Sequence, residues 1–127
     1  MERDEHPFRV AAAPQDGHGG PVLVVSVEGE LDVAVAGELS AELAEERWAD
    51  YPAVVIDLAA LTFLDSAGLH SLLLGTEALT AAGRPHAIVV QPSSPINSIL
   101  GLTGLAERLP LHSDREEALR AVKPSSR

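Results

Sequence analysis

Short apolar runs alternate with amphipathic stretches along most of the chain. Val22 to Glu28 is rich in β-branched residues and ends at Gly29, which predicts a strand. Residues 53–58 are apolar apart from Asp57, a pattern typical of a strand covered on both faces. Further strands are expected at residues 8–13, 86–91 and 109–111, and loops at residues 14–21, 29–32 and 59–64.

Four other stretches repeat their apolar residues every three or four positions, which predicts helices. In the first helix Val35, Leu39 and Leu43 share one face. The helices are expected to begin near Asp32, Ser66, Ser94 and Asp114, each close to a capping residue, and the second helix to end at Gly83.

Alternating strands and helices imply right-handed crossovers and a mixed, mainly parallel sheet. We therefore expect a single α/β domain over residues 1–127, with four or five strands and about four helices. Its core would span about residues 8–122, between short flexible termini. The functional loops should lie at the carboxyl ends of the parallel strands.

Charge and composition exclude several classes of function. The net charge is −10, Lys123 is the only lysine, and the arginines are scattered, so neither nucleic acid nor a membrane is expected as a direct partner. No cysteine is present, which removes disulfides and thiolate zinc sites. Without a signal-peptide pattern or a long apolar run, the protein is expected to be cytoplasmic.

The most informative segment is residues 64–69, Leu-Asp-Ser-Ala-Gly-Leu, which joins a buried strand to the second helix. Ser66 stands at that junction, where serine is also a preferred helix cap. A capping role and a modification site are compatible, because a hydroxyl at a helix start is accessible to a kinase. A phosphate there would also face the positive end of the helix dipole.

The second helix is predicted to have two different faces. Its core face would consist of Leu69, Leu72, Leu73, Thr76 and Leu79. The opposite face carries almost no charge in an otherwise acidic protein, which suggests contact with another protein, although a neighbouring loop could also cover it. The residues of this predicted partner-binding face are Ala67, His70, Ser71, Leu74 and Ala78.

Three segments resemble one protein family in the same order along the chain. Residues 55–69 resemble the signature of anti-sigma factor antagonists, which are members of the STAS family. Residues 29–32, Gly-Glu-Leu-Asp, resemble the family's other common loop. The helix that begins at Ser94, with its tail at residues 102–105, is also similar.

The resemblance implies a partner-switching mechanism. An unphosphorylated antagonist binds an anti-sigma factor, which is itself a serine kinase, and thereby frees a sigma factor. The kinase phosphorylates the serine that follows the motif aspartate, here Ser66, and a PP2C-type phosphatase reverses the modification. Asp32 and Asp65 match the family's loop aspartates, which lie near that serine and the partner surface. Ala67 departs from many phosphorylated relatives, which carry a second hydroxyl residue there, and His70 is also atypical.

Other readings remain open at this stage. Ser66, His70 and Asp57 could suggest a hydrolase, but a Gly-x-Ser-x-Gly elbow is lacking, and we expect no enzyme. A phospho-aspartate receiver built on Asp57 lacks the acidic pair and late lysine that it would need. Neither the five histidines nor the aspartates at positions 32, 57 and 65 predict a metal site, and no cofactor is expected. The remaining alternative is a non-switching STAS module that serves as a scaffold, ligand sensor or accessory subunit.

Overall fold

One six-stranded sheet organises the protein, and the structure, a computed structural model, describes residues 7–122. The sheet has the order β1-β2-β3-β5-β6, and β4 extends it by pairing with the far end of β2. Only β1 and β2 are antiparallel. The strands are β1 (Phe8–Gly17), β2 (Gly20–Leu31), β3 (Ala53–Asp57), β4 (Leu61–Leu64), β5 (His86–Val89) and β6 (Leu111–His112).

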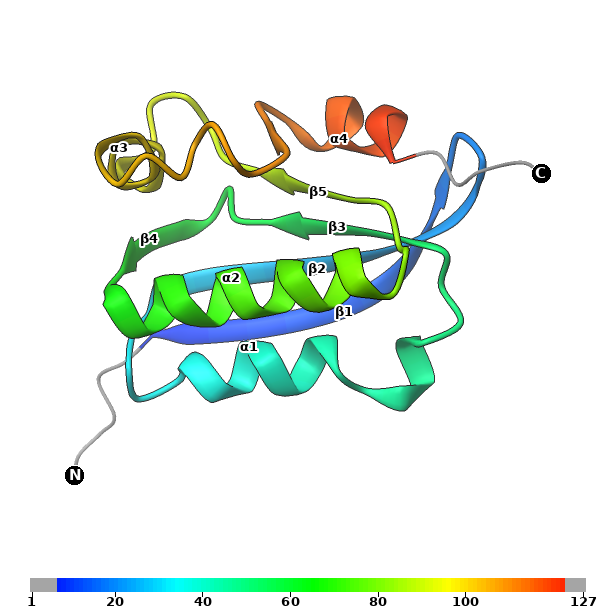
Figure 1. The fold of residues 1–127 in the computed structure, drawn as a ribbon, viewed down its shortest axis with the longest axis horizontal. Coiled ribbons are helices and arrows are strands. Elements are labelled where there is room, and N and C mark those ends of the chain that lie inside the picture. The colour runs from blue at the N-terminus through cyan, green and yellow to red at the C-terminus, as the bar shows by residue number, and fades with distance from the viewer. Residues whose placement is uncertain (1–6, 123–127) are drawn as a thin grey trace.

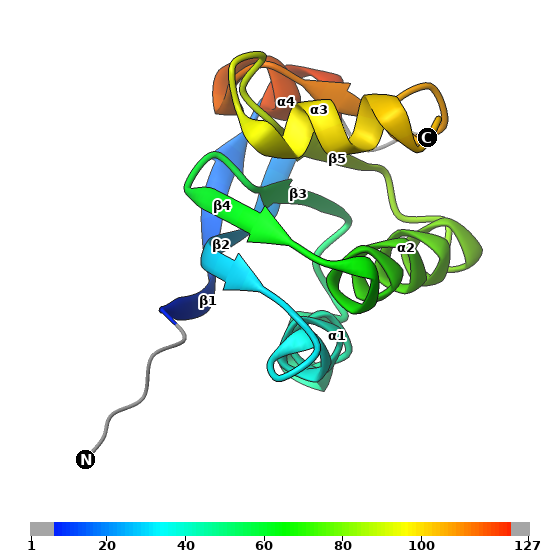
Figure 2. The same ribbon diagram turned by 90° about the vertical axis from the view of Figure 1, so that its left-hand side faces the viewer.

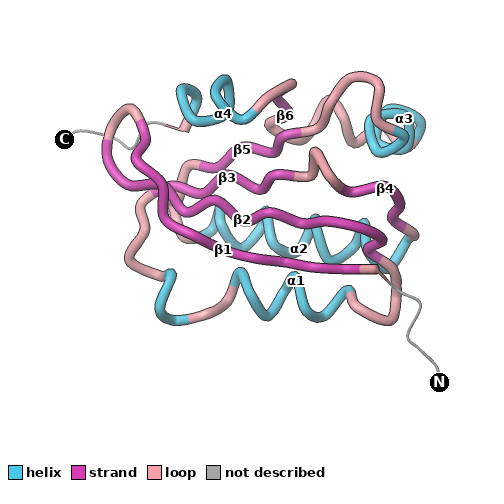
Figure 3. Tube along the Cα trace, turned by 180° about the vertical axis from the view of Figure 1, so that it is seen from behind, coloured by secondary structure: helices cyan, strands magenta, loops and turns pink. Residues whose placement is uncertain are grey.

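Four helices surround this sheet: α1 (Ala36–Leu43), α2 (Ser66–Ala81), α3 (Pro95–Leu102) and α4 (Arg115–Ala121). Helices α1 and α2 lie side by side over one face (Figure 1). The view from behind shows β1 and β2 in front of α2 (Figure 3). Helix α4 contacts β3, β5 and β6, and α3 contacts β4. None of the described helices is long and apolar enough to cross a lipid bilayer.

The alternation of side chains along β2 divides the core into two buried clusters. Leu23 and Val25 face the larger cluster, which α1, α2 and α3 complete. Val22 and Val24 point the other way, into a smaller cluster closed by α4. All five residues of β3 are buried because both of its faces are covered. The α/β, mainly parallel architecture expected from the sequence is thus confirmed.

Three segments expected as loops are at least partly strands instead. Residues 61–64 form β4, which pairs with Gly29, Glu30 and Leu31. Consequently β2 also continues through residues 29–31, and the sheet has six strands. The residues after Pro14 continue β1 as far as Gly17 instead of turning at once. Proline is found mainly in edge strands such as β1, where only the backbone groups on one side take part in the ladder. The predicted flexible termini concern residues 1–6 and 123–127, which lie outside the described part.

Three of the four helices have a side-chain cap close to their predicted start, and α1 has none. Asp65, Ser94 and Asp114 each cap a helix with a side-chain oxygen. Gly83, with φ +70°, follows the end of α2 as expected. Asp32, however, does not cap α1: its Oδ1 accepts a hydrogen bond from the N–H of Ala34 (3.0 Å), in a turn before the helix.

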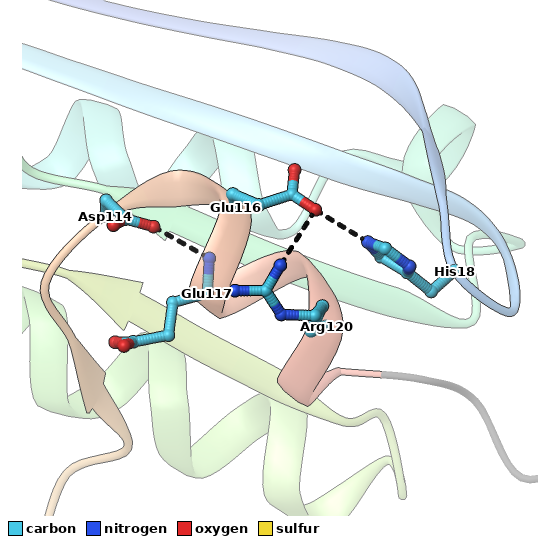
Figure 4. A network of polar contacts seen from close by, with 5 residues as sticks. All are labelled: His18, Asp114, Glu116, Glu117 and Arg120. Atoms are coloured by element: carbon cyan, nitrogen blue, oxygen red, sulfur yellow. Dashed lines mark hydrogen bonds and ion pairs between the residues drawn. The ribbon is translucent and has the colours of Figure 1, made fainter.

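Helix α4 is joined to the tip of the β1–β2 hairpin by exposed polar contacts (Figure 4). One carboxylate oxygen of Glu116 lies 2.9 Å from Nε2 of His18 and 3.3 Å from Nη1 of Arg120. Asp114 accepts a hydrogen bond from the N–H of Glu117 (2.8 Å) at the start of the helix. Of these contacts, only that between His18 and Glu116 links segments about a hundred residues apart, and pairs so open to water add little stability.

A more buried ion pair holds the start of α4 against β3. Oδ2 of Asp57 accepts hydrogen bonds from Nε (2.9 Å) and Nη2 (2.7 Å) of Arg115. The Asp57 side chain is 10% exposed and that of Arg115 43%. Asp57 Oδ1 is also occupied, by the N–H of Ala59. The aspartate considered above for a hydrolase or a receiver is therefore engaged in a structural ion pair.

We predict that Arg115→Ala lowers the free energy of unfolding by about 2 kcal/mol, as measured by urea denaturation. Loss of one partner of a fully buried pair costs about 3 to 5 kcal/mol, and the exposure of Arg115 reduces that figure here. Arg120→Ala is the matched control, because its pair with Glu116 is 58% exposed on both sides and should contribute at most about 0.5 kcal/mol. Equal losses in the two variants would contradict this account.

Candidate functional site

The candidate site lies at the carboxyl ends of β2 and β4, where the sheet edge meets the start of α2. This end of the molecule faces the viewer in Figure 2. Because Leu31 of β2 is paired with Leu64 of β4, the loops that follow the two strands lie next to each other. The first loop contains Asp32 and Val33, and the second contains Asp65 and Ser66. The two loops singled out in the sequence thus come together.

Asp65 joins these two loops through both oxygens of its carboxylate. Oδ1 accepts a hydrogen bond from the N–H of Gly68 (2.9 Å), which caps the first turn of α2. Oδ2 accepts one from the N–H of Val33 (3.1 Å), in the other loop. The N–H of Asp65 itself is directed to the carbonyl of Leu31 (3.3 Å). A carboxylate at the N-terminus of a helix is also favoured by the helix dipole.

Gly68 allows the first turn of α2 to lie directly against β2. A Cβ atom built on Gly68 would be 2.2 Å from the carbonyl oxygen of Leu31, far below any tolerated contact. Gly68 is buried, and its own N–H is the one that Asp65 binds. The glycine of the Asp-Ser-Ala-Gly segment is therefore needed for close approach, not for an unusual backbone angle.

Ser66 is the first residue of α2, and its side chain is exposed. Asp65, and not Ser66, caps the helix, so the serine hydroxyl is not used in capping. Within residues 7–122 no acceptor is found for the N–H groups of Ser66 and Ala67. The serine thus stands in the open beside two backbone donors at the positive end of the helix.

Exposed residues continue from Ser66 along α2 at intervals of four. His70, Leu74 and Ala78 are all exposed, and Leu74 retains 47% of its accessible surface. Residues four apart lie above one another on a helix, so these side chains form one stripe, which we call the α2 stripe (Ser66, His70, Leu74 and Ala78). None of its four residues is an aspartate, glutamate, lysine or arginine. Ala67 is half-buried beside it.

Ser71 does not belong to the exposed face, which corrects the sequence-based expectation. It is 4% exposed; its hydroxyl donates to the carbonyl of Ala36 (2.7 Å) and lies 2.9 Å from Oγ of Ser40. One turn on, a Cβ atom at Gly75 would meet Leu43 of α1 at 2.5 Å. Helix α1 therefore packs against the small residues of α2. The helical pattern shows which residues share a face but not which element covers it.

On the same side as Ser71 and Gly75, the α2 stripe borders a depression between α1 and α2. Its volume is about 240 Å³. Leu74 and Ala78 of α2 border it, together with Leu43 at the end of α1 and Ala44, which follows that helix. A depression of this kind has room for one large apolar side chain of a partner, which is how interface anchors are commonly seated.

Two exposed apolar residues near Ser66, Val33 and Phe63, were not predicted from the sequence. Val33 is 75% exposed and directly follows Asp32, and Phe63 of β4 is 45% exposed. Phe63 is one of only two phenylalanines in the chain, and it was hidden in a segment expected to be a loop. Val33 follows Asp32, where the first helix was expected to begin. Large apolar side chains that stay in water next to an ordered loop mark a surface suited to protein contact.

Neither a hydrolytic centre nor a metal centre is assembled in the described residues. Asp57 is bound to Arg115, and no hydrogen bond connects His70 to Ser66 or to Asp57. Residues 7–122 contain no group of three or more histidine or carboxylate side chains that could hold a metal ion. Asp32 is 9% exposed and Asp65 is occupied by two backbone N–H groups, so both aspartates shape the loops.

Comparison with known proteins agrees with this geometry. The protein-family model of the STAS domain matches residues 13–118. The chain belongs to the STAS domain family. It is 36% identical over 107 residues to the anti-sigma-F factor antagonist RsfB of Mycobacterium tuberculosis, covering 84% of each protein.

Two solved structures are similar to the chain over most of its length. The crystal structure of an anti-sigma factor antagonist from Mycobacterium paratuberculosis is similar at a TM-score of 0.73 and 33% identity, covering 90% of this chain and 94% of that one. The phosphorylated form of the Bacillus protein SpoIIAA shares the fold, with a TM-score of 0.59 and 19% identity over 87% of this chain and 93% of that one.

We predict that Gly68→Ala lowers the free energy of unfolding by about 2 to 3 kcal/mol, because the added methyl group must push β2 and α2 apart. Gly37→Ala in α1 is the matched control. A Cβ atom at Gly37 meets nothing within 4 Å, so this variant should be neutral or more stable by up to about 1 kcal/mol. Urea denaturation of both variants measures the difference, and a neutral Gly68→Ala would refute the close-approach argument.

Proposed function

We propose that this protein is an anti-sigma factor antagonist. It binds an anti-sigma factor through the loops that follow β2 and β4 and through the α2 stripe, and so releases a sigma factor. We further propose that the anti-sigma factor is a serine kinase that inactivates the antagonist by phosphorylating Ser66, and that a PP2C-type phosphatase restores it. The observation that carries the proposal is the exposed hydroxyl of Ser66, next to apolar side chains and outside the capping bonds. The names of the similar mycobacterial proteins support the partner class.

The docking surface would have an apolar centre around the serine. Val33 lies against Asp65 from one side, and Phe63 precedes it on β4. Leu74 extends the apolar surface along the helix. Apolar anchors of this kind bind best when a partner covers them and excludes water. The serine hydroxyl would then lie inside the covered area, where its chemical state controls binding.

Phosphorylation of Ser66 would act on this surface without changing the fold. It adds about −1.5 to −2 charges at pH 7. Two like charges about 6 Å apart repel by roughly 3 kcal/mol at an effective dielectric constant near 20, which is about a hundredfold in affinity. Covering a dianion with apolar groups adds a desolvation cost. Meanwhile the unbonded N–H groups of Ser66 and Ala67 would accommodate the phosphate in the free protein.

We expect a kinase-active anti-sigma factor, incubated with ATP and this protein, to place one phosphate on Ser66, as detected by mass spectrometry of the digested protein. The Ser66→Ala variant should remain unmodified and still bind. Phosphorylated protein should bind the same anti-sigma factor about a hundredfold more weakly in calorimetry.

Ser66→Asp should weaken binding less than phosphate does, because it adds a single charge on a shorter side chain. The control is Ala13→Asp, which adds the same charge at an exposed position opposite Val24, far from the carboxyl ends of the strands. Equal affinities for wild type, Ser66→Ala and the phosphorylated protein would instead indicate a non-switching STAS module.

A second test concerns the apolar centre. Val33→Asp should lower affinity for the anti-sigma factor by about tenfold or more, because a charge replaces an apolar contact beside Asp32 and Asp65. Its unfolding free energy should change little, since the Val33 side chain is mostly in water. Ala13→Asp again provides the control for added charge. Unchanged affinity of Val33→Asp would place the docking surface elsewhere.

A further inference from the structure

A second concave surface lies along the C-terminal half of α2, away from Ser66. It is a groove of about 870 Å³, within the usual range of about 300 to 1,000 Å³ for small-molecule sites. One wall is formed by α2 and the other by residues 105–110, and the start of β5 closes it. The side chains that the argument uses are Leu73, Glu77, Arg84, His86, Arg108 and Leu109.

Basic side chains are concentrated in this groove. The whole chain carries 9 basic and 19 acidic residues, yet two arginines and a histidine line the groove against a single carboxylate, that of Glu77. Arg108 is exposed, and its guanidinium makes no hydrogen bond or ion pair with any residue in the range 7–122, although its backbone N–H donates to the carbonyl of Leu105. Its guanidinium is therefore available to a ligand, in a fork geometry that matches a carboxylate.

Arg84 supplies a fixed positive charge to the same groove. Its Nε donates to the carbonyl of Tyr51 and its Nη2 to that of Trp48, both at 2.9 Å. Partial burial lowers the pKa of Arg84 from its usual value. An arginine keeps its charge under such conditions. Because Tyr51 and Trp48 do not line the groove, Arg84 adds positive charge at its edge, and Arg108 is the arginine whose guanidinium is left for a ligand.

His86 adds a polar group of defined orientation. Its Nδ1 lies 2.9 Å from the carbonyl oxygen of Arg84. Since a carbonyl oxygen only accepts, Nδ1 must carry the hydrogen, which leaves Nε2 as the remaining polar atom of the ring. The rest of the lining is largely apolar, with leucines from both walls and two prolines.

We propose that this groove binds a small amphipathic carboxylate, such as a medium-chain fatty acid. The apolar chain would lie between Leu73 and Leu109, and the carboxylate would accept hydrogen bonds from Arg108 near Arg84. Glu77 lines the same groove and disfavours ligands with several negative charges, such as nucleotides. This binding site is separate from Ser66 and does not depend on the proposed phosphorylation.

The test is titration of the ¹⁵N-labelled full chain with decanoate, below its micelle concentration, followed by amide chemical shifts. We expect saturable shifts confined to the second half of α2, the start of β5 and residues 105–110. Arg108→Ala should weaken binding about tenfold, since one charged anchor is lost. Arg120→Ala, an exposed arginine of α4, is the matched control and should bind like wild type.

Decylammonium, which has the same chain and the opposite charge, should shift these amides far less. Absence of saturable shifts in the groove, equal binding of decylammonium, or equal effects of Arg108→Ala and Arg120→Ala would each overturn the proposal. No anti-sigma factor takes part in this experiment, so its failure would leave the Ser66 proposal untouched.

Discussion

The two hydrogen bonds accepted by the Asp65 carboxylate hold the candidate site together. One ends on the N–H of Gly68 in the first turn of α2, and the other on the N–H of Val33 in the loop after β2. The same side chain thus fixes the start of a helix and its position against a neighbouring strand. Close approach between Gly68 and the carbonyl of Leu31 makes this arrangement possible. A single carboxylate thereby decides where Ser66 stands.

Because Asp65 performs the capping, Ser66 is spared that role and its hydroxyl faces water. Chemistry at this position can change the charge of the surface without breaking a bond on which the fold depends. The surrounding surface is suited to such control, because Val33, Phe63 and Leu74 expose apolar area around or beyond the serine. A charge added amid apolar groups has its largest effect where a partner excludes water. The fold thus separates the aspartate that holds the two loops together from the serine that we propose is phosphorylated.

Much of this arrangement was readable from the sequence because its signals are local. The buried run of β3 and the caps at Ser94 and Asp114 each depend on neighbouring residues, and the structure confirms them. The errors arose where distant segments decide the outcome. Strand β4 exists because it pairs with the end of β2, although two of its four residues are exposed. Ser71 is buried because α1 lies beside α2, and no helical pattern identifies the neighbour of a face.

Helix α2 contributes to both proposed binding surfaces: the candidate docking surface lies at its start and the basic groove along its second half. The central claim is that Ser66 lies inside the footprint of an anti-sigma factor. It is tested most directly by cross-saturation in the complex of labelled antagonist and unlabelled anti-sigma factor. The account predicts signal loss at the amides of Val33, Ser66, Ala67 and His70. A footprint confined to α4 or to the edge strand β1 would contradict it.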